Sequence, residues 1–288
     1  MHADLVPNRI ARVAVFAAAL VILGSLVAVG EPRPATAGGC ENTAITTWPV
    51  ASGGNGHRYQ AVCPPDFVTS DEASADATAA GGYLVTIMSA EENAFVFDLV
   101  DSIALWDPRP SECWTPGPLI GAYEPDGTQE PDGGWLWSTG EALDYENWAD
   151  GEPNNHEGND ENRALFGSAG CGPALNPAPV WHDIGQYDAA PSYIIEWGPL
   201  IQGDVDCDGD VDEADAIYLL EVESGAEGGE QPAPCPDVGE PTGDYPWGDI
   251  NCDGNVDALD ALHLIAFRAG FELEPIGDPC TPIGQPLD

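Results

Sequence analysis

The chain has 288 residues, of which 50 are acidic and only seven basic, and its formal net charge at neutral pH is −43. A surface of this sign repels phosphate backbones, so composition excludes nucleic acid as an expected partner. Acidity of this degree serves either solubility or the binding of divalent cations, and the spacing of the carboxylates must decide between the two.

The chain begins with the pattern of an export signal. Arg9 and Arg12 form a short basic region, residues 13–29 are almost wholly apolar, and Ala35-Thr36-Ala37 provides a small-x-small cleavage site. We therefore expect residues 1–37 to be a signal peptide. The alternative is an uncleaved membrane anchor, because the apolar run is near the lower length limit for a span. All eight Cys lie beyond the signal, and an even number of Cys in an exported chain indicates disulfides.

The rest of the chain is long enough for two domains, which we place at residues 38–200 and 201–288 and call the head and the tail. No second long apolar run follows the signal. We therefore expect a soluble mature protein that is secreted or held at the cell surface, with no membrane span.

The head is expected to mix short helices with strands. Its predicted strands cover residues 57–62, 83–87, 119–123, 135–137, 163–166 and 193–197, and its predicted helices cover residues 70–80 and 89–100. The second helix opens with a capping box, in which Glu92 follows Ser89 by three positions. Two helices followed by a loop-rich, Trp-rich β region predict a compact α+β fold. The indole rings of Trp135, Trp137, Trp148 and Trp181 are expected in its core.

Oxygen-bearing side chains gather late in the head. They lie in Asn147 to Asn155, in Asn159 to Asn162, and in Trp181-His182-Asp183. If the Glu152–Pro153 peptide is cis, the two side chains that flank it could face one ion. Glu152, Asn154 and Asp183, with either Asp160 or Glu161, could then hold a calcium ion that keeps two coordination positions open. By count from Glu152 we favour Asp160.

An open calcium ion suits a sugar, because two vicinal hydroxyls can coordinate the ion and also hydrogen-bond the side chains that hold it. Amides offer a donor whereas carboxylates only accept, so their arrangement can discriminate between hydroxyl geometries. The alternative interpretation is ordinary loop composition, since Asn, Asp, Gly and Pro are common in turns.

From His57 to Trp197 the chain resembles a C-type lectin domain. The resemblance is carried by the stretch 81–93, by Leu119-Ile120-Gly121-Ala122 in the central strand, and by Glu152-Pro153-Asn154, the signature of mannose-type ligands in that family. It implies a calcium-dependent lectin that binds mannose-type sugars. The implied carbohydrate-binding residues are Glu152, Asn154, Asp160, His182 and Asp183, and all of these except His182 are implied calcium ligands. His182 replaces the Asn of the family, and imidazole is a poorer calcium ligand than an amide oxygen.

The disulfides of that family are not reproduced in the head. Ile195 and Asn162 stand at two of the positions where the family has Cys. The four Cys of the head must therefore pair differently, and of the three possible connectivities we favour Cys40–Cys63 with Cys113–Cys171.

The tail contains a duplicated acidic loop. Asp204-Val-Asp206-Cys-Asp208-Gly209 recurs 45 residues later as Asp249-Ile-Asn251-Cys-Asp253-Gly254. Oxygen side chains at loop positions 1, 3 and 5, a Gly at position 6 and a carboxylate at position 12 are the pattern of a calcium loop. A Cys follows each loop Cys after 28 residues, so we expect Cys207–Cys235 and Cys252–Cys280, with crossed pairing left open. Helices are expected at residues 216–220 and 261–265 and should pack together.

Paired loop-helix units with Asp at position 12 and no preceding helix resemble dockerin modules, and the resemblance covers residues 203–288. By that resemblance one ion would be held by Asp204, Asp206, Asp208, Asp212 and Asp215, and the other by Asp249, Asn251, Asp253, Asp257 and Asp260. Dockerins bind cohesins through loop positions 10 and 11. These are Glu213-Ala214 and Ala258-Leu259 here rather than hydroxyl pairs, so a cohesin-like partner and a stand-alone calcium-stiffened module both remain open.

Motifs of the common enzyme classes are missing from the sequence: it has no Gly-x-Ser-x-Gly, no His-Glu-x-x-His and no Gly-rich Lys loop. A glycosidase needs only two carboxylates and stays open by this criterion. We expect an exported calcium-dependent carbohydrate-binding protein, not an enzyme, with a lectin-like head and a dockerin-like tail. The alternative is an adhesin or assembly protein whose head binds protein and whose tail tethers it to a cohesin-like scaffold.

Overall fold

The computed structural model describes residues 40–109, 114–125, 133–156, 159–168, 177–226, 234–271 and 273–287. The predicted signal peptide lies outside these residues, as do Cys113 and Cys171. The signal peptide and the Cys113–Cys171 disulfide therefore remain predictions. Within the described ranges, no helix has the length and apolar character needed to cross a membrane.

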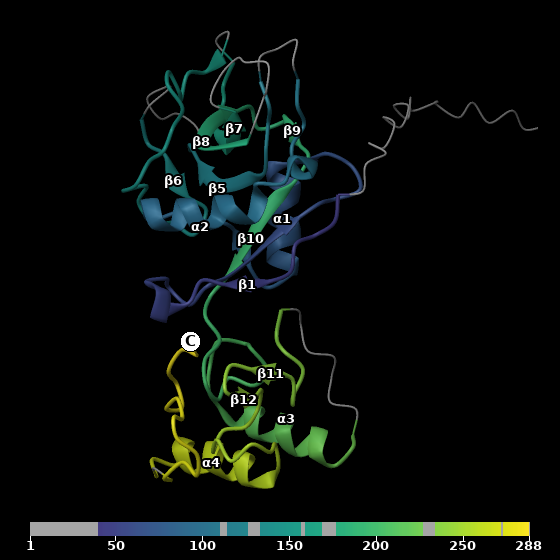
Figure 1. Ribbon diagram of the computed structural model, residues 1–288, viewed down its shortest axis with the longest axis vertical. Helices are drawn as coiled ribbons and strands as arrows, with labels where there is room; N and C mark the ends of the chain where they lie inside the picture. The colour runs from purple at the N-terminus through teal and green to yellow at the C-terminus, as the bar shows by residue number, and fades with distance from the viewer. Residues whose placement is uncertain are drawn as a thin grey trace, which may run out of the picture. The chain divides into compact units, whose positions relative to one another are not determined.

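An eight-stranded sheet forms the centre of the head (Figure 1). Its strands follow the order β1-β2-β10-β5-β7-β8, while β4 pairs with β10 and β6 with β5. Their bounds are β1 Thr46–Thr47, β2 Arg58–Val62, β4 Tyr83–Leu84, β5 Leu119–Tyr123, β6 Leu136–Trp137, β7 Arg163–Ser168, β8 Pro177–Ile184 and β10 Tyr193–Trp197. β10 and β5 run parallel, and the other pairs are antiparallel. A separate two-stranded sheet joins β3 Val68–Thr69 to β9 Ala189–Ala190.

Two helices pack on this sheet, which gives the predicted α+β architecture. α1 spans Ser70–Ala79 and lies against β4 and β10, while α2 spans Ala90–Val100 and lies against β2 and β8 (Figure 1). Short 3-10 helices cover Val50–Ser52 and Ile103–Leu105. The capping box opens α1 rather than α2: the Thr69 side chain accepts from Glu72 N, and the Glu72 side chain accepts from Thr69 N.

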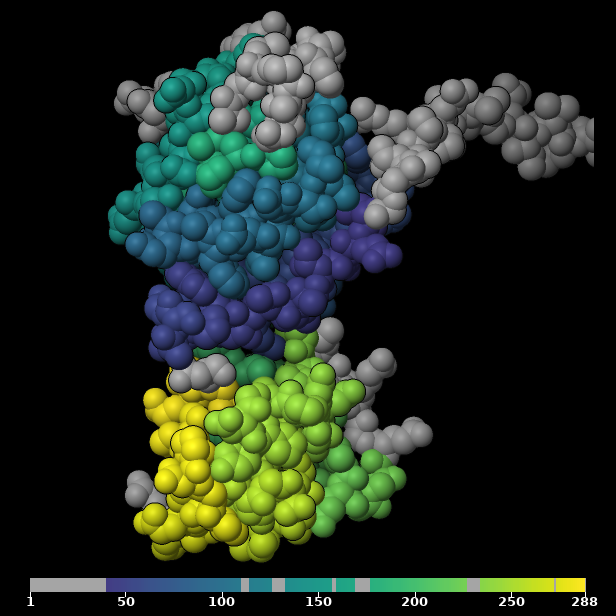
Figure 2. All heavy atoms as spheres, in the orientation of Figure 1, coloured from purple at the N-terminus to yellow at the C-terminus, as the bar shows by residue number. Residues whose placement is uncertain are grey.

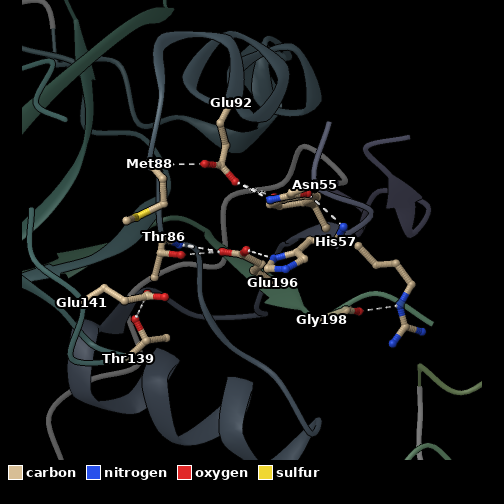
Figure 3. Close-up of polar contacts among 11 residues, drawn as sticks. Asn55, His57, Thr86, Met88, Glu92, Thr139, Glu141, Glu196 and Gly198 are labelled. Carbon is tan, nitrogen blue, oxygen red and sulfur yellow. Dashed lines mark hydrogen bonds and ion pairs between the residues drawn. The ribbon is translucent and has the colours of Figure 1, made fainter. Parts of the chain in front are cut away.

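The predicted capping box of α2 is wrong in its second half. The Ser89 side chain does cap the helix by accepting from Glu92 N. The Glu92 carboxylate, however, turns into the core, where it is 2% exposed. There it accepts from Tyr59 Oη at 2.6 Å, from Asn55 Nδ2 at 2.9 Å and from Met88 N at 2.7 Å (Figure 3). Burying a charge is costly unless donors such as these compensate it, so the carboxylate serves tertiary structure instead of the helix end.

A second buried carboxylate, Glu196 on β10, lies in the same region (Figure 3). It is 1% exposed. One oxygen accepts from Thr86 N at 2.8 Å, and the other lies 2.6 Å from His57 Nδ1. These contacts connect the residue before β2 and a residue just after β4 to β10.

Aromatic rings fill the core beneath β8, as the sequence predicts. Trp137 and Trp181 are fully buried, Trp135 is 7% exposed, and Trp148 packs against the same cluster. Trp181 meets Trp137 edge to face at 5.6 Å between ring centroids and Trp148 at 5.8 Å. Its Nε1 donates to Asn93 Oδ1 at 2.9 Å. Pairs of this kind add about 1 kcal/mol each beyond burial, so they fix the strand that carries His182 and Asp183.

The tail has a separate core built from its two repeats. α3 Glu213–Glu223 and α4 Ala258–Arg268 contribute equivalent residues to it, namely Ala216 and Leu219 from α3 and Ala261 and Leu264 from α4. The predicted helices therefore do pack together. The segment between the repeats forms a hairpin of β11 Pro241–Thr242 and β12 Tyr245–Pro246. On the face drawn in Figure 2, this light-green segment lies beside the yellow C-terminal residues.

Each repeat of the tail accommodates a side chain of the other at a glycine. A Cβ on Gly203 would lie 3.0 Å from Leu264 of α4, and a Cβ on Gly248 would lie 2.9 Å from Leu219 of α3. Both glycines also have positive φ, which disfavours other residues. The predicted disulfides Cys40–Cys63, Cys207–Cys235 and Cys252–Cys280 are all present, and the last two close the two repeats in the same way.

Candidate functional site

Two segments of the head that are distant in sequence meet around a hollow of about 470 Å³. One is the loop that follows Trp148, and the other is the end of β8. Apart from Trp114, all of its lining residues carry carboxyl, amide or imidazole groups: Glu152, Asn154, His156, Asn159, Glu161, His182, Asp183 and Asp188. The hollow therefore gathers most of the side chains that the sequence singles out.

Asp183 organises the loop on the opposite side of the hollow. It lies at the end of β8, is 5% exposed, and follows the buried Trp181 by two positions, so the pleat directs both side chains to the same face. Its carboxylate accepts from Asn154 N at 2.9 Å and from Asn155 N at 2.9 Å. The Glu152–Pro153 peptide in this loop is cis.

Glu152 lies at the centre of the polar contacts. Its Oε2 accepts from Asn154 Nδ2 at 2.6 Å, and its Oε1 lies 3.0 Å from His182 Nδ1. It also shares a hydrogen bond with Asp183. Burial, and then this contact with Glu152, raise the pKa of Asp183 to about 7. Burial also acts to raise the pKa of Glu152, but hydrogen bonds with His182 and Asp183 outweigh it and lower that pKa.

This donor set fits a calcium ion. Two carboxyl groups that hydrogen-bond each other in a partly buried site require a proton between them or a cation in its place. Carboxylate and amide oxygens are the ligands that calcium prefers, and Glu152, Asn154 and Asp183 provide them from two converging segments.

The acid in the wall of the hollow is Glu161 and not Asp160. Glu161 N donates to Asn155 Oδ1 at 3.0 Å, and its Oε2 accepts from His156 N at 2.6 Å. Burial raises the pKa of Glu161. Asp160 is exposed and is not among the lining residues. The ligand set that the geometry favours therefore replaces Asp160 with Glu161, the alternative that the sequence leaves open.

Three of the lining residues belong to none of the sequence motifs: Trp114, His156 and Asp188. Asp188 closes the turn after β8, where its Oδ2 accepts from Gly185 N at 3.0 Å. Trp114 comes from a segment about 40 residues before the loop, so only the fold brings it to the site. No local sequence signal identifies these positions as part of one cavity.

The first tail loop holds its predicted ligands in a compact cluster. Asp204, Asp206 and Asp208 place carboxylate oxygens within 4.8 Å of one another. Oδ1 of Asp204 is buried without a hydrogen-bond partner, which is costly unless a cation or a donor occupies the site. Asp215, at position 12, accepts from Val205 N at 2.6 Å and Asp212 N at 2.7 Å. The residues present fit a calcium ion.

The second loop repeats the arrangement. Asp249 Oδ2 accepts from Gly254 N at 2.7 Å. Asp260 is 0% exposed and accepts from Ile250 N at 2.8 Å, from Asn251 N at 3.0 Å and from Asp257 N at 2.8 Å. Burial is the main reason why the pKa of Asp260 is raised to about 6, as are those of Asp204 and Asp215 in the first loop.

The two position-9 residues, Asp212 and Asp257, have a second role as helix caps. Asp212 accepts from Ala214 N at 2.6 Å, and Asp257 accepts from Leu259 N at 2.7 Å. Each is also part of a capping box with the position-12 Asp. Loop and helix are therefore one unit in each repeat, and a substitution in either should change the stability of both.

No protein-family model matches the chain. Over 80 residues the chain is 36% identical to Lectin BRA-3 of Megabalanus rosa, a match that covers 28% of this chain and 39% of that protein. Over 73 residues it is 38% identical to Regenerating islet-derived protein 3-alpha of Mus musculus, which covers 25% of this chain and 37% of that protein. The chain thus spans about two fifths of the length of these relatives.

Among solved structures, the chain is similar to the carbohydrate-recognition domain of the mouse scavenger receptor C-type lectin. The two are 19% identical with a TM-score of 0.39, and the match covers 56% of this chain and 98% of that domain. The sequence match to a lectin, together with the α+β architecture described above, supports a C-type lectin-like domain in this chain.

Proposed function

We propose that the chain is an exported, calcium-dependent carbohydrate-binding protein whose head takes a mannose-type sugar in the hollow at Glu152, Asn154 and Asp183. The observation that carries the proposal is the convergence of these three side chains. Asp183 accepts from the backbone of residues 154 and 155, and Glu152 accepts from the Asn154 amide. Oxygen ligands from two distant segments are thereby held together at the wall of one cavity.

The chemistry of binding follows from the donors and acceptors in this hollow. Glu152, Asn154, Glu161 and Asp183 would hold the ion, which supplies a point of coordination for two sugar hydroxyls. Glu152 and Asp183 accept hydrogen bonds from hydroxyls, whereas the amide of Asn154 donates one. Charge-assisted bonds of this kind are roughly twice as strong as neutral ones, and they provide the orientation as well as the affinity.

The tail, in this proposal, is a dockerin-like module with two structural calcium ions. Its loops carry the ligand pattern in both repeats, and disulfides brace both. Export fits the three disulfides of the described residues, since such bonds persist in oxidising compartments. We propose binding without catalysis, because the polar residues of the hollow are explained by ion and hydroxyl recognition.

A glycan array on the full chain, run with calcium and with a chelator, tests the proposal. We expect binding to mannose-type glycans in calcium and loss of that binding in chelator. By the family resemblance, the double substitution Glu152→Gln with Asn154→Asp should move the preference toward galactose-type sugars. Absence of glycan binding in both conditions would sink the carbohydrate proposal. An unchanged preference in the double variant would place the sugar elsewhere.

A protein-binding role for the tail has its own supporting observation. Both repeats expose apolar side chains at equivalent positions, Ile217 with Leu262 and Leu220 with Ile265. Apolar surface of this kind on a soluble module favours a protein partner, and a cohesin-like domain is the candidate. Calorimetry of the full chain with a purified cohesin domain tests it. No heat of binding at micromolar concentrations would leave the tail as a stand-alone module.

A further inference from the structure

We propose that Gln202 and Trp247 are positioning residues, each supplied by one repeat of the tail to the calcium loop of the other repeat. Gln202 comes two residues before the first loop (204–215), and Trp247 comes two residues before the second loop (249–260). Each nevertheless contacts the backbone of the opposite loop. The inference rests on the proposed function, in which both loops hold calcium, and deepens it by adding one outer contact to each site.

The two residues occupy equivalent positions in the duplication. Trp247 follows Gln202 by 45 residues, the same offset as that of the two loops. Each is held by a pair of backbone hydrogen bonds, and the partners obey the same offset: Gly284 and Gln285 for Gln202, and Gly239 and Glu240 for Trp247. The same backbone frame therefore places both side chains, although one is an amide and the other an indole.

Both side chains are buried and donate a hydrogen bond across the tail. Trp247 is 2% exposed, and its Nε1 donates to Val205 O of the first loop at 3.1 Å. Gln202 is 6% exposed, and its Nε2 donates to Asp249 O of the second loop at 3.1 Å. An indole N–H only donates and a carbonyl oxygen only accepts, so neither contact depends on a protonation state.

In the second loop, the contact reaches the same peptide group as the position-12 carboxylate does. The carbonyl of the Asp249–Ile250 peptide accepts from Gln202, and the N–H of that peptide donates to Asp260 Oδ1 at 2.8 Å. Asp249 is itself the ligand at position 1 of the loop pattern. One peptide group thus lies between Gln202 of the first repeat and two of the residues that would hold the ion.

The first loop repeats this arrangement one peptide further along. The carbonyl of the Val205–Asp206 peptide accepts from Trp247, and its N–H donates to Asp215 Oδ1 at 3.2 Å. Asp206 and Asp215 stand at positions 3 and 12 of the loop pattern. In both repeats, therefore, a side chain of the other repeat fixes a peptide group that hydrogen-bonds the position-12 carboxylate.

Such a contact should contribute to calcium affinity. Ion binding and loop folding are coupled, so a hydrogen bond made in the folded loop adds to the apparent affinity for the ion. Loss of an outer partner of a metal site typically costs about 10–100-fold in affinity. Because the contacts are crossed, removal of either donor should weaken the distant loop and not the neighbouring one.

The amide signals of Gly209 and Gly254 can report on the two loops separately. Gly209 N donates to Asp204 Oδ2 at 3.1 Å, and Gly254 N donates to Asp249 Oδ2 at 2.7 Å. Each glycine amide therefore contacts the position-1 carboxylate of its own loop. A calcium titration of the full chain, followed by ¹H–¹⁵N NMR at these two amides, gives the half-saturating calcium concentration of each loop.

Trp247→Phe keeps a large aromatic ring but removes the Nε1 donor. We expect the half-saturating concentration to rise about tenfold at Gly209 and by less than about threefold at Gly254, since Gln202 still contacts the second loop. Tyr245→Phe is the matched control, because it removes a polar group from β12 of the same hairpin. Among the described residues, the Tyr245 hydroxyl forms no hydrogen bond with either loop, so both concentrations should stay unchanged.

Gln202→Met preserves the length of the side chain but removes its amide, and it should produce the reverse pattern. The half-saturating concentration should rise about tenfold at Gly254 and by less than about threefold at Gly209. Gln285→Met makes the same chemical change on an exposed side chain next to Gln202 and should leave both loops unchanged. If Trp247→Phe does not fold, Gln202→Met still carries the test.

The crossed pattern separates positioning from a general loss of structure. A substitution that only disturbed its surroundings would act on the loop two residues away, or on both loops equally. Either of those results would overturn the inference, as would unchanged concentrations at both glycines. A wild-type chain in which neither glycine amide responds to calcium contradicts the proposed calcium sites of the tail themselves, so the two failures are distinguishable.

Discussion

The hollow of the head and the loops of the tail gather carboxylates in opposite ways. In the tail, the position-12 carboxylates accept from backbone N–H groups a few residues away, as Asp260 does from Ile250, Asn251 and Asp257. In the hollow, Glu152 and Asp183 come from segments 31 residues apart and hydrogen-bond each other. The tail loops are therefore local devices that carry their own scaffold, whereas the hollow exists only when the sheet has formed.

The difference matters for what each site can do. A carboxylate that accepts from three amides is fixed before any ion arrives and is buried, as the 0% exposure of Asp260 shows. The side chains of the hollow line an open cavity in which a ligand can meet them. We infer that the tail sites serve stability and the head site serves recognition, and the predictions below test that division.

Calcium removal should produce the largest loss of stability, and this loss should be confined to the tail. At free calcium about 1000-fold above the dissociation constant, an ion stabilises the folded loops by about 4 kcal/mol. Amide hydrogen exchange of the full chain resolves the regions: protection of α3 and α4 should fall about 1000-fold in chelator. The strands β2 and β10 of the head should change far less. Equal protection of α3 and α4 with and without chelator would contradict a structural role for the ions.

Asp260→Ala should destabilise the tail by about 3 kcal/mol even in chelator, because it leaves three backbone donors of the loop without their acceptor. Asn255→Ala is the matched control, since the calcium-loop pattern uses only the backbone carbonyl of position 7 and the Asn255 side chain makes a single exposed hydrogen bond, to Asp253 Oδ1. Urea unfolding, monitored by amide hydrogen exchange at α4, gives the loss of unfolding free energy for both variants. A loss that appears only in the presence of calcium would make Asp260 a ligand without a scaffold role.

Glu161→Gln should raise the calcium concentration that the head needs for half-maximal glycan binding about tenfold, because Glu161 lines the hollow. A tenfold change corresponds to about 1.4 kcal/mol. Asp160→Asn removes the same charge one residue away on an exposed side chain and should change the requirement less than threefold. The half-maximal calcium concentration for glycan binding measures both. The reverse order of effects would restore Asp160 as the ligand.

The tail was predictable because its signals are local. Alternating Asp, a Gly at position 6 and the Asp that caps each helix lie within 12 residues, and the duplication doubles the evidence. The two disulfides follow from the same repeat. The hairpin β11–β12 between the repeats escaped prediction because its strands have only two residues each, and two of those four residues are Pro.

The head was predictable in its elements and less so in its site. β8 went unpredicted because Pro177 and Pro179 interrupt its pattern, and the structure tolerates them because β8 is the edge strand of the sheet. The oxygen chemistry of the side chains grouped Glu152 and Asn154 with Asp183, and the resemblance to lectins gave the same grouping. The choice of Glu161 over Asp160 depends on which side chain faces the hollow before β7, and spacing alone does not determine that.

Glu92 provides the smallest test, because it is a buried carboxylate for which the chain supplies all the observed donors. Burial, the largest contribution, raises its pKa above the ordinary value, while hydrogen bonds from Tyr59 and Met88 oppose the shift. A carboxyl group with a raised folded-state pKa contributes stability that is fully present below the unfolded pKa and is lost as the pH rises through the folded one. Glu92→Gln cannot titrate, so it should flatten the fall in unfolding free energy between pH 4.5 and pH 7.

Urea unfolding in chelator, monitored by Trp fluorescence at several pH values, gives the slope of unfolding free energy against pH for the wild type and for Glu92→Gln. The chelator removes any contribution from calcium. Glu196 and His57 lie near Glu92 and remain in both proteins, so the difference between the two slopes isolates Glu92 (Figure 3). A slope that is equal or steeper in Glu92→Gln would mean that the donors around Glu92 offset the cost of burial completely. Such a result would place Glu92 with the carboxylates of the tail loops, as a charge that the backbone and its neighbours hold without strain.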